Sequence, residues 1–441
     1  MFIQNSSYPK PLPISVFCGI GKPSIEQFLD NLVTELKNLT SNYFCFQSHY
    51  YKIAKVIFIC DAPARSYLQC IKGHSAKLGC GYCRVEGVYL EDRVCFSYND
   101  SIEMRCNDFY CNIQENNQIR PSPLLHVVDL VYDFPPEYLH SVCLGVVKKL
   151  CTYFFTYVRG LKLPCRLSVA QKDEMSSTIL HIRKFLPKEF HRKLRSLKEF
   201  EHYKAVEFRA ILIYLGPFLF KKYLPSDFFN HFLLLHFSVY VFCSPIHSER
   251  YFSQAEMCIE KFCYEADILY KNKLSSYNTH IIRHIPKFVQ LYGILDNWSS
   301  FRFENYLSIL KRRLKCTNGI FAQTVNNLFL IRDLFSNISS HDVFFNCSSP
   351  DNCAVLSCGT IILIMEVNYY ENIIFVSGYK MRFIKSLYSY PYESQCLSIG
   401  YYTKSDTILS LVKPVLKCIC IPLDNNQYIC IPFVNMNLCS M

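Results

Sequence analysis

The sequence predicts a mixed α/β protein, because the pattern of its 441 residues changes twice along the chain. The first part alternates short β-prone runs with a helical run, and the long middle part is dominated by helical periodicity. The last part consists of β-branched and aromatic runs broken by Asn, Gly and Pro. Hydrophobic residues make up 50% of the chain, which is enough to bury a large core and build more than one domain.

The N-terminal part reads as strand, helix and strand. Pro13–Cys18 is a short β-prone run, and Ser24 is positioned to cap a helix that continues to Leu39. Lys55–Cys60, with the sequence KVIFIC, predicts a buried strand, and Asp61 follows it directly. Open α/β sheets bind ligands beyond the carboxyl ends of their strands, so Asp61 is a candidate for chemistry.

The middle of the chain begins with a loop-rich stretch from Gly73 to Gln118, in which Val88–Phe96 predicts a hairpin. Pro135 and Pro136 then open a helical region. The predicted helices are Tyr138–Arg159, Ser168–Phe185, Phe200–Tyr214, Phe228–Cys243, Gln254–Tyr264 and Phe301–Lys315. The apolar run Phe232–Cys243 is too short to span a bilayer and indicates a buried helix. From about Pro350 onward the β-type runs predict a small separate domain.

The charge and cysteine content narrow the class of protein. Lys and Arg number 47 against 36 Asp and Glu, a net charge of +11 that favours a polyanionic partner such as nucleic acid, although a solvated basic surface gives the same balance. Met1 leads into polar, Pro-containing sequence without a secretory signal. The 24 cysteines are therefore expected to be free thiols in a reducing compartment.

Two short motifs together predict a metal site. Cys80 and Cys83 are separated by two residues, and His280 and His284 lie four apart, on one face of a helix. These are the two halves of a tetrahedral zinc site, and their separation along the chain would make the metal a staple for a large insertion. A chance CxxC is the alternative in so cysteine-rich a chain. The competing ligands nearby are Cys70, His74 and Cys95.

Two carboxylates flank these motifs, Asp61 before the cysteines and Glu304 after the histidines. A structural zinc site could hold two carboxylates close together, as phosphoryl transfer requires. In that chemistry, two Mg²⁺ ions about 4 Å apart activate the nucleophile and stabilise the leaving oxygen. The alternative for Asp61 is a helix cap or turn.

Six separated runs carry a family resemblance: FICDAPARSYLQCIKGHSAKLGCGYCRVEGVYLEDRVCF, RPSPLL, YLHSVCLGVVKKL, YKAVEFRAILIYLGP, SSYNTHIIRHIPKFVQLYG and FRFENYLSILKRRL. In this order they resemble the CACTA (EnSpm-type) DNA transposases of invertebrates. The wider class includes Mirage and Chapaev elements and, more distantly, the catalytic subunit of the V(D)J recombinase. The resemblance covers nearly the whole chain.

The resemblance implies a DDE transposase with an RNase H-like core. Its second catalytic Asp falls on Asp61 and its Glu on Glu304, with Mg²⁺ as catalytic ion, while its structural zinc ligands fall on Cys80, Cys83, His280 and His284. The implied fold is a partial RNase H-like core interrupted by a large, mostly helical insertion, plus a small C-terminal β domain. The corresponding segments are 1–72 and 291–345 for the core, 73–290 for the zinc-stapled insertion and 346–441 for the β domain.

The sequence departs from the family at the first catalytic Asp. In the family this residue lies upstream of the segment that begins here at Pro11, and the first Asp of this sequence, Asp30, falls inside a predicted helix. The expectation is therefore a transposase-derived protein that binds DNA without cleaving it. The resemblance further implies transposon ends as the DNA partner, assembly of copies of the chain, a nuclear location and no membrane.

Several other residues have both a functional and a structural interpretation. Lys311, Arg312 and Lys315, on the predicted helix of Glu304, are candidates for DNA phosphate contacts, or simply a basic helix end. His140 matches a family motif and is best explained as a structural histidine. Trp298, the only tryptophan, is expected in the core rather than stacked on a flipped base.

Two rival functions remain at this level. The first is a domesticated DNA- or protein-binding module that keeps the transposase core only as a scaffold. The second is an unrelated zinc hydrolase that uses Cys80, Cys83 and one histidine. A four-ligand zinc site has no open position for substrate, which argues against the hydrolase.

Overall fold

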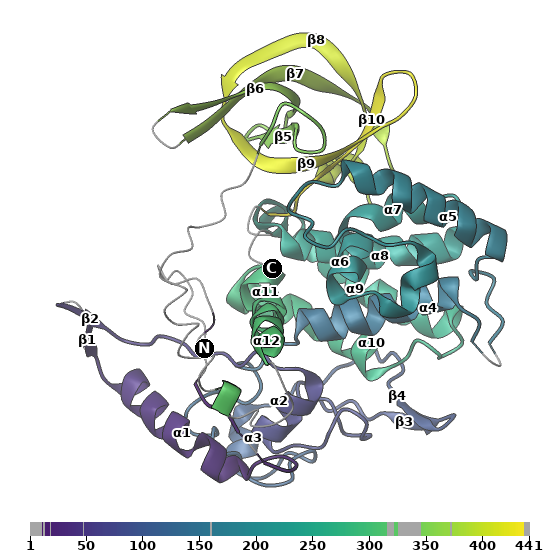
Figure 1. Cartoon of the computed structure of the whole chain (residues 1–441). Helices are drawn as coiled ribbons and strands as arrows, with labels where there is room; N and C mark the ends of the chain where they lie inside the picture. Colours follow the sequence, from purple (N-terminus) through teal and green to yellow (C-terminus); the bar gives the residue numbers. More distant parts are fainter. Residues whose placement is uncertain are drawn as a thin grey trace. The chain divides into compact units, whose positions relative to one another are not determined.

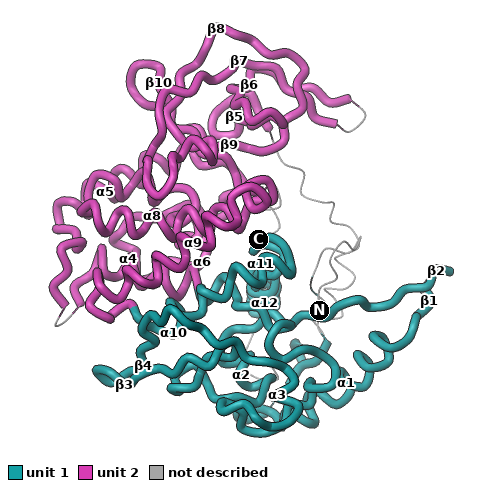
Figure 2. Tube along the Cα trace, turned by 180° about the vertical axis from the view of Figure 1, so that it is seen from behind, with its two compact units in different colours: residues 1–141, 275–340, 441 teal, residues 142–274, 341–440 magenta. Residues whose placement is uncertain are grey.

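The computed structural model describes residues 11, 14–17, 19–46, 48–158, 161–314, 322–324, 345–370 and 373–435. The chain forms two compact units, each built from segments distant in sequence (Figures 1 and 2). Unit 1 comprises residues 1–141, 275–340 and 441, and unit 2 comprises residues 142–274 and 341–440. The fold class is mixed α/β, with helices in both units and a six-stranded sheet near the C-terminus.

Unit 1 consists of short elements joined by long irregular segments. Those before residue 142 are α1 Ile25–Ser41, β1 Phe44–Phe46, β2 His49–Tyr51, α2 Ala62–Gln69, β3 Val88–Leu90, β4 Arg93–Cys95 and α3 Asn107–Cys111. The π-helical segment η1, Leu139–Val147, runs across the boundary into unit 2. Later in the chain come α10 Tyr277–Ile281, η5 Ile282–His284, α11 Ile285–Tyr292, η6 Leu295–Trp298 and α12 Phe301–Arg313.

The N-terminal helix and the predicted hairpin are confirmed. Helix α1 follows Ser24 and buries one apolar stripe, which includes Leu29, Val33 and Leu36. Strands β3 and β4 pair antiparallel around Glu91 and Asp92. Both turn residues have positive φ, at 47° and 60°, as the tightest two-residue hairpin turn requires.

The prediction of a buried strand at Lys55–Cys60 is wrong. This segment forms no regular secondary structure and pairs with no described strand, and its residues are exposed or half-buried. Within this segment, Phe58 N donates a backbone hydrogen bond to Asp133 O at 2.7 Å. Residues 14–17, the described part of the predicted strand Pro13–Cys18, are irregular too. A β-prone run becomes a strand only when a partner satisfies its backbone, and among the described residues of unit 1 the only pairs are β1–β2 and β3–β4.

The helical part of unit 2 occupies residues 142–274. Its α-helices are α4 Lys148–Phe155, α5 Val169–Ile182, α6 Ala205–Ala210, α7 Gly216–Phe220, α8 Ser226–Cys243 and α9 Pro245–Leu269. Short segments η2 Arg183–Phe185, η3 Leu197–His202 and η4 Ile211–Leu215 connect them. The five helical regions predicted here all contain helices. Helix α9 begins nine residues before the predicted Gln254 because Ser244 caps it, accepting a hydrogen bond from His247 N.

Helix α8 is the centre of this helical part. Every residue from His231 to Cys243 is buried, as the apolar run predicted. Its two histidines are satisfied internally: His231 Nε2 lies 2.9 Å from Phe262 O, and His236 Nδ1 lies 2.7 Å from Leu212 O. Burial lowers the pKa of both imidazoles to about 4, so they are neutral core residues. Among the described residues, no helix combines the length and apolar character that a membrane crossing requires.

The C-terminal β region of unit 2 is a closed antiparallel barrel (Figure 1). Its strands are β5 Cys353–Leu356, β6 Ile361–Tyr370, β7 Ile373–Ser386, β8 Gly400–Val412, β9 Pro414–Pro422 and β10 Gln427–Pro432. The order around the barrel is β10-β8-β7-β6-β5-β9, and the turn η8, Ser394–Leu397, lies between β7 and β8. Closure removes free strand edges, so a small barrel is stable with a narrow core.

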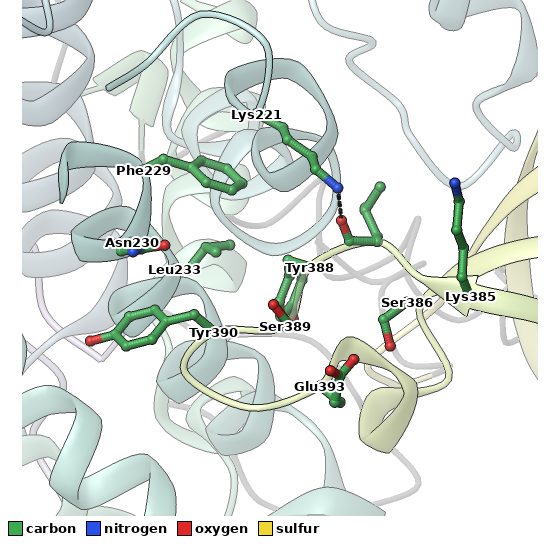
Figure 3. Close-up of a pocket in the computed structure, with 11 residues that line it drawn as sticks. Lys221, Phe229, Asn230, Leu233, Lys385, Ser386, Tyr388, Ser389, Tyr390 and Glu393 are labelled. Atoms are coloured by element: carbon green, nitrogen blue, oxygen red, sulfur yellow. Dashed lines mark hydrogen bonds between the residues drawn. The ribbon is translucent and has the colours of Figure 1, made fainter. Parts of the chain in front are cut away.

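The barrel is anchored to the helical part of unit 2 by buried polar contacts. Lys417 Nζ, fully buried on β9, lies 2.7 Å from Glu189 Oε1 and 2.6 Å from Asp351 Oδ1. Elsewhere in unit 2, residues of α8, the end of β7 and the segment that follows β7 line an open pocket of about 360 Å³ (Figure 3). Lys221 crosses it and donates to Leu387 O.

Candidate metal centre and carboxylate cluster

The cysteine half of the predicted metal site lies in a tight loop of unit 1. Tyr82 N donates to Cys80 Sγ at 3.4 Å, and Cys80 O accepts from Arg105 Nε at 2.9 Å and Asn117 Nδ2 at 3.1 Å. Gly79 permits this turn, because a Cβ there would lie 2.5 Å from Gly73 O. These contacts fix the backbone of the loop, and both thiols point toward the two histidines.

The histidine half lies on one continuous helical stretch, α10–η5–α11, which is capped by Ser276. His280 and His284 are each 3% exposed. Aromatic rings hold both imidazoles: the Phe96 ring stacks on His280 at 5.1 Å, and the Tyr82 ring lies 5.1 Å from His284. The helical spacing of four places both rings on the side that faces the cysteine loop.

The structure brings the four predicted ligands together. One ligand atom from each of Cys80, Cys83, His280 and His284 lies within 4.8 Å of all the others. The Cys83 and Cys80 sulfurs are 3.6 Å apart, Cys83 Sγ is 3.2 Å from His280 Nε2, and Cys80 Sγ is 3.5 Å from His284 Nε2. In a tetrahedral zinc site with Zn–S of about 2.3 Å and Zn–N of about 2.05 Å, two sulfur ligands lie roughly 3.8 Å apart and a sulfur and a nitrogen ligand roughly 3.6 Å apart. The group can therefore hold a metal ion and is compatible with structural zinc.

The electrostatics of Cys80 and His284 suit a metal ion, whereas the hydrogen bond with Cys80 raises the pKa of Cys83. Burial opposes ionisation of Cys80, yet the Cys83 thiol and the imidazoles of His280 and His284 hold the pKa of Cys80 well below its ordinary value. Burial lowers the pKa of His284, which keeps this imidazole neutral. A thiolate and a neutral imidazole are the forms that bind metal ions.

A buried polar layer surrounds the centre. Arg65, 4% exposed, donates to the hydroxyls of Tyr82 and Tyr277, and its guanidinium lies 4.8 Å from the Tyr82 ring. Tyr82 OH in turn donates to Phe134 O at 2.6 Å. This network links α2, the cysteine loop and the histidine helix, and it orients the ligands as supporting residues do in metalloproteins. The competing residues Cys70, His74 and Cys95 are not part of the group.

Asp61 lies at the start of α2, where it acts as the helix cap. Its Oδ1 accepts a hydrogen bond from Ala64 N at 2.8 Å, and Pro63 occupies the first turn. This is the structural alternative that the sequence left open.

Glu137, which sequence analysis missed, organises the space beside Asp61. Its buried carboxylate accepts from Leu139 N at 2.8 Å, His140 N at 2.6 Å and Ser300 N at 3.0 Å. It also holds the His140 ring, with Nδ1 2.7 Å from Glu137 Oε2. The opposite ring nitrogen, Nε2, lies 3.9 Å from Glu304 Oε1. The Glu-x-x-His spacing at the start of a helix was the available signal.

The charges of both Asp61 and Glu304 act on the His140 ring. The hydrogen bond that His140 donates to the Glu137 carboxylate raises the pKa of His140 despite partial burial, and the charges of Glu137, Asp61 and Glu304 add to this effect. Although burial opposes it, bonds from His140 and Ser300 lower the pKa of Glu137. The predicted structural role of His140 agrees with these contacts.

The carboxylates fit a shared Mg²⁺ poorly in this arrangement. Among the described residues, Asp61 and Glu304 do not belong to a group of three or more close metal-binding side chains. Glu137 is saturated by its four donors and cannot supply a third carboxylate without losing them.

The other predicted residues lie on or near α12. Lys311 and Arg312 are exposed near its C-terminal end, and Arg312 Nε donates to Ser308 O at 3.3 Å. Lys315 lies outside the described residues. Trp298 is fully buried, with Nε1 donating to Gly293 O at 3.1 Å, so the core assignment is confirmed.

Comparison with known proteins adds one match. A family model described as a domain of unknown function, DUF8592, matches residues 317–436, which include the six strands of the barrel. No curated protein matches the chain.

Proposed function

We propose that this protein is a DNA-binding derivative of a DDE transposase, stapled by a structural zinc ion at Cys80, Cys83, His280 and His284. The observation that carries the proposal is the convergence of these four residues from distant segments, at separations that fit tetrahedral zinc. The CACTA resemblance assigns the same four positions to zinc. Bound there, the ion would hold the loop before the helical insertion against the helix after it.

The proposal includes DDE ancestry at Asp61 and Glu304, in an RNase H-like core. Glu304 lies 3.9 Å from His140 Nε2, and the charge of Asp61 also acts on His140, although the two carboxylates come from segments far apart in the chain. The saturated state of Glu137 and the unpaired Lys55–Cys60 segment support the further inference that this arrangement does not cleave DNA.

DNA binding rests on the net charge of +11 and on the exposed cations of α12. We place the protein in the nucleus, bound to DNA of transposon ends and assembled with other copies of itself. The second candidate is a domesticated binding module that keeps the transposase core only as a scaffold. The hydrogen bonds that occupy Glu137 favour this candidate, because a scaffold needs no third carboxylate to bind a catalytic metal ion.

A binding and nicking assay tests the proposal. Full-length protein is mixed with a labelled duplex at several salt concentrations, and with supercoiled plasmid in Mg²⁺ or Mn²⁺. We expect binding that weakens with salt and no conversion of plasmid to the nicked form. Metal-dependent nicking that Glu304→Gln abolishes would overturn the inferred inactivity. Absence of DNA binding at low salt would overturn the DNA-binding function itself.

A further inference from the structure

A second group of metal-binding side chains lies inside the C-terminal barrel. The sulfurs of Cys353, Cys418 and Cys430 all lie within 4.8 Å of one another, and each residue is fully buried. None of these cysteines belongs to the site in unit 1, and none is paired in a disulfide.

Strand register explains why three thiols meet at one point. Cys418 on β9 and Cys430 on β10 belong to adjacent paired strands, in which Cys420 is directly opposite Cys430. On the other side of β9, Ala354 of β5 is opposite Lys417, so the next position along places Cys353 beside Cys418. Side chains two apart on a strand share a face, which directs Cys418 and Cys420 alike into the barrel.

A further thiol, Cys420, lies next to this group. It is 7% exposed and is directly opposite Cys430 across β9 and β10, but it is not one of the three residues whose sulfurs all lie within 4.8 Å of one another. The barrel interior therefore contains three converging sulfur atoms and a fourth thiol close by.

We propose that Cys353, Cys418 and Cys430, with Cys420 available as a fourth ligand, bind one thiophilic metal ion, Zn²⁺ or Cu⁺, inside the barrel. Thiolate ligands select these soft or borderline cations over Mg²⁺ and Ca²⁺. The ion joins β5, β9 and β10 at the point where the short strand β5 closes the barrel. The proposal concerns unit 2 alone and does not depend on the transposase ancestry.

The surroundings fit a closed structural site. The same interior contains Val355, Ile361, Met381 and Leu416, which exclude water from the thiols. An ordinary apolar core would tolerate valine in place of these cysteines with little change in stability. A metal site would instead lose its ion and the stability that the ion supplies.

Metal analysis of the purified full-length protein tests the proposal. Protein prepared under reducing conditions is desalted, and its zinc and copper are measured by mass spectrometry. We expect two metal ions per chain in the wild type and one in the variant Cys418→Val/Cys430→Val. The matched control is Cys151→Val, which replaces a buried thiol of α4 outside both groups and should keep both ions.

A second pair of variants separates the two sites. Cys80→Ser/Cys83→Ser should remove the ion of unit 1 and leave that of the barrel, so the barrel site can be present even if the zinc staple of unit 1 is absent. Reconstitution of metal-free protein with Zn²⁺ alone or Cu⁺ alone, in competition with a chelator of known affinity, identifies the ion.

Thiol protection in the wild-type protein provides a readout that needs no folded variant. Alkylation followed by peptide mass spectrometry should show Cys353, Cys418 and Cys430 at least tenfold slower to react when metal is present than after chelation, while Cys151 is unaffected. Equal metal content in the wild type and Cys418→Val/Cys430→Val would overturn the proposal. So would alkylation rates at the three cysteines that chelation does not change.

Discussion

At the scale of single residues, the metal centre of unit 1 depends on ionisation set by close neighbours. Burial alone would raise the pKa of the Cys80 thiol, whereas Cys83, His280 and His284 together lower it. Removing the cation that compensates a buried thiolate leaves an unpaired charge, which is costly in a protein interior. The stability of unit 1 should therefore depend on bound metal.

The first prediction concerns Cys83→Ser. We expect this variant to lose the ion of unit 1 and several kcal/mol of stability, because structural zinc contributes directly to folding. Thermal unfolding with and without chelator measures the effect. Cys111→Ser, at an exposed cysteine of α3, is the control and should unfold like the wild type. An unchanged response of Cys83→Ser to chelation would rule out its role as a ligand.

The second prediction concerns Glu137, whose carboxylate satisfies three backbone N–H groups and the His140 ring. Glu137→Ala should cost about 2–4 kcal/mol, since it leaves several buried donors without an acceptor. Denaturant unfolding gives the value. Glu103→Ala, whose carboxylate side chain is 68% exposed in a surface ion pair, should change stability by about 1 kcal/mol or less. Equal losses in the two variants would contradict the organising role of Glu137.

These residues also show what sequence can predict at this scale. The four ligands were identifiable because ligand geometry dictates their spacing. Two residues lie between the cysteines on a loop, and the histidines are four positions apart on a helix. Glu137 was missed because its role depends on Ser300 N, a backbone group far along the chain. The barrel thiols were missed because only the register of β5 against β9 brings Cys353 to Cys418.

At the scale of elements, local signals were sufficient where an element stabilises itself. Helix α1, the β3–β4 hairpin and the buried helix α8 follow from periodicity, turn residues and apolar content within their own segments. Lys55–Cys60 was predicted wrongly because a strand depends on its neighbours, and the described residues provide none there. Cooperative pairing is not encoded in a single β-prone run.

The third prediction separates the two roles of Asp61. As the cap of α2, Asp61→Ala should cost about 1 kcal/mol, whereas Asp61→Asn should keep the cap and stay within about 0.5 kcal/mol of the wild type. Chemical denaturation of both variants makes the comparison. If Asp61→Asn destabilises as much as Asp61→Ala, the negative charge rather than the cap is what unit 1 requires.

At the scale of the whole molecule, a surplus of positive charge is expected to drive DNA binding, and α12 presents part of it. The fourth prediction is that Lys311→Ala/Arg312→Ala reduces the slope of log K against log salt by about 2, one for each lost phosphate contact. The control is Lys198→Ala/Lys222→Ala, at two lysines whose side chains are 79% and 65% exposed. A similar loss of slope in the control would mean that binding follows total charge and not α12.

The central claim is that two distant segments of unit 1 are joined by zinc, and X-ray absorption at the zinc edge tests it most directly. The sample is full-length Cys418→Val/Cys430→Val, so that the barrel thiols do not contribute. We predict two sulfur neighbours at about 2.3 Å and two nitrogen neighbours at about 2.0–2.1 Å. A shell of oxygen and nitrogen alone, a shell of four sulfurs, or protein that purifies without zinc would contradict the account.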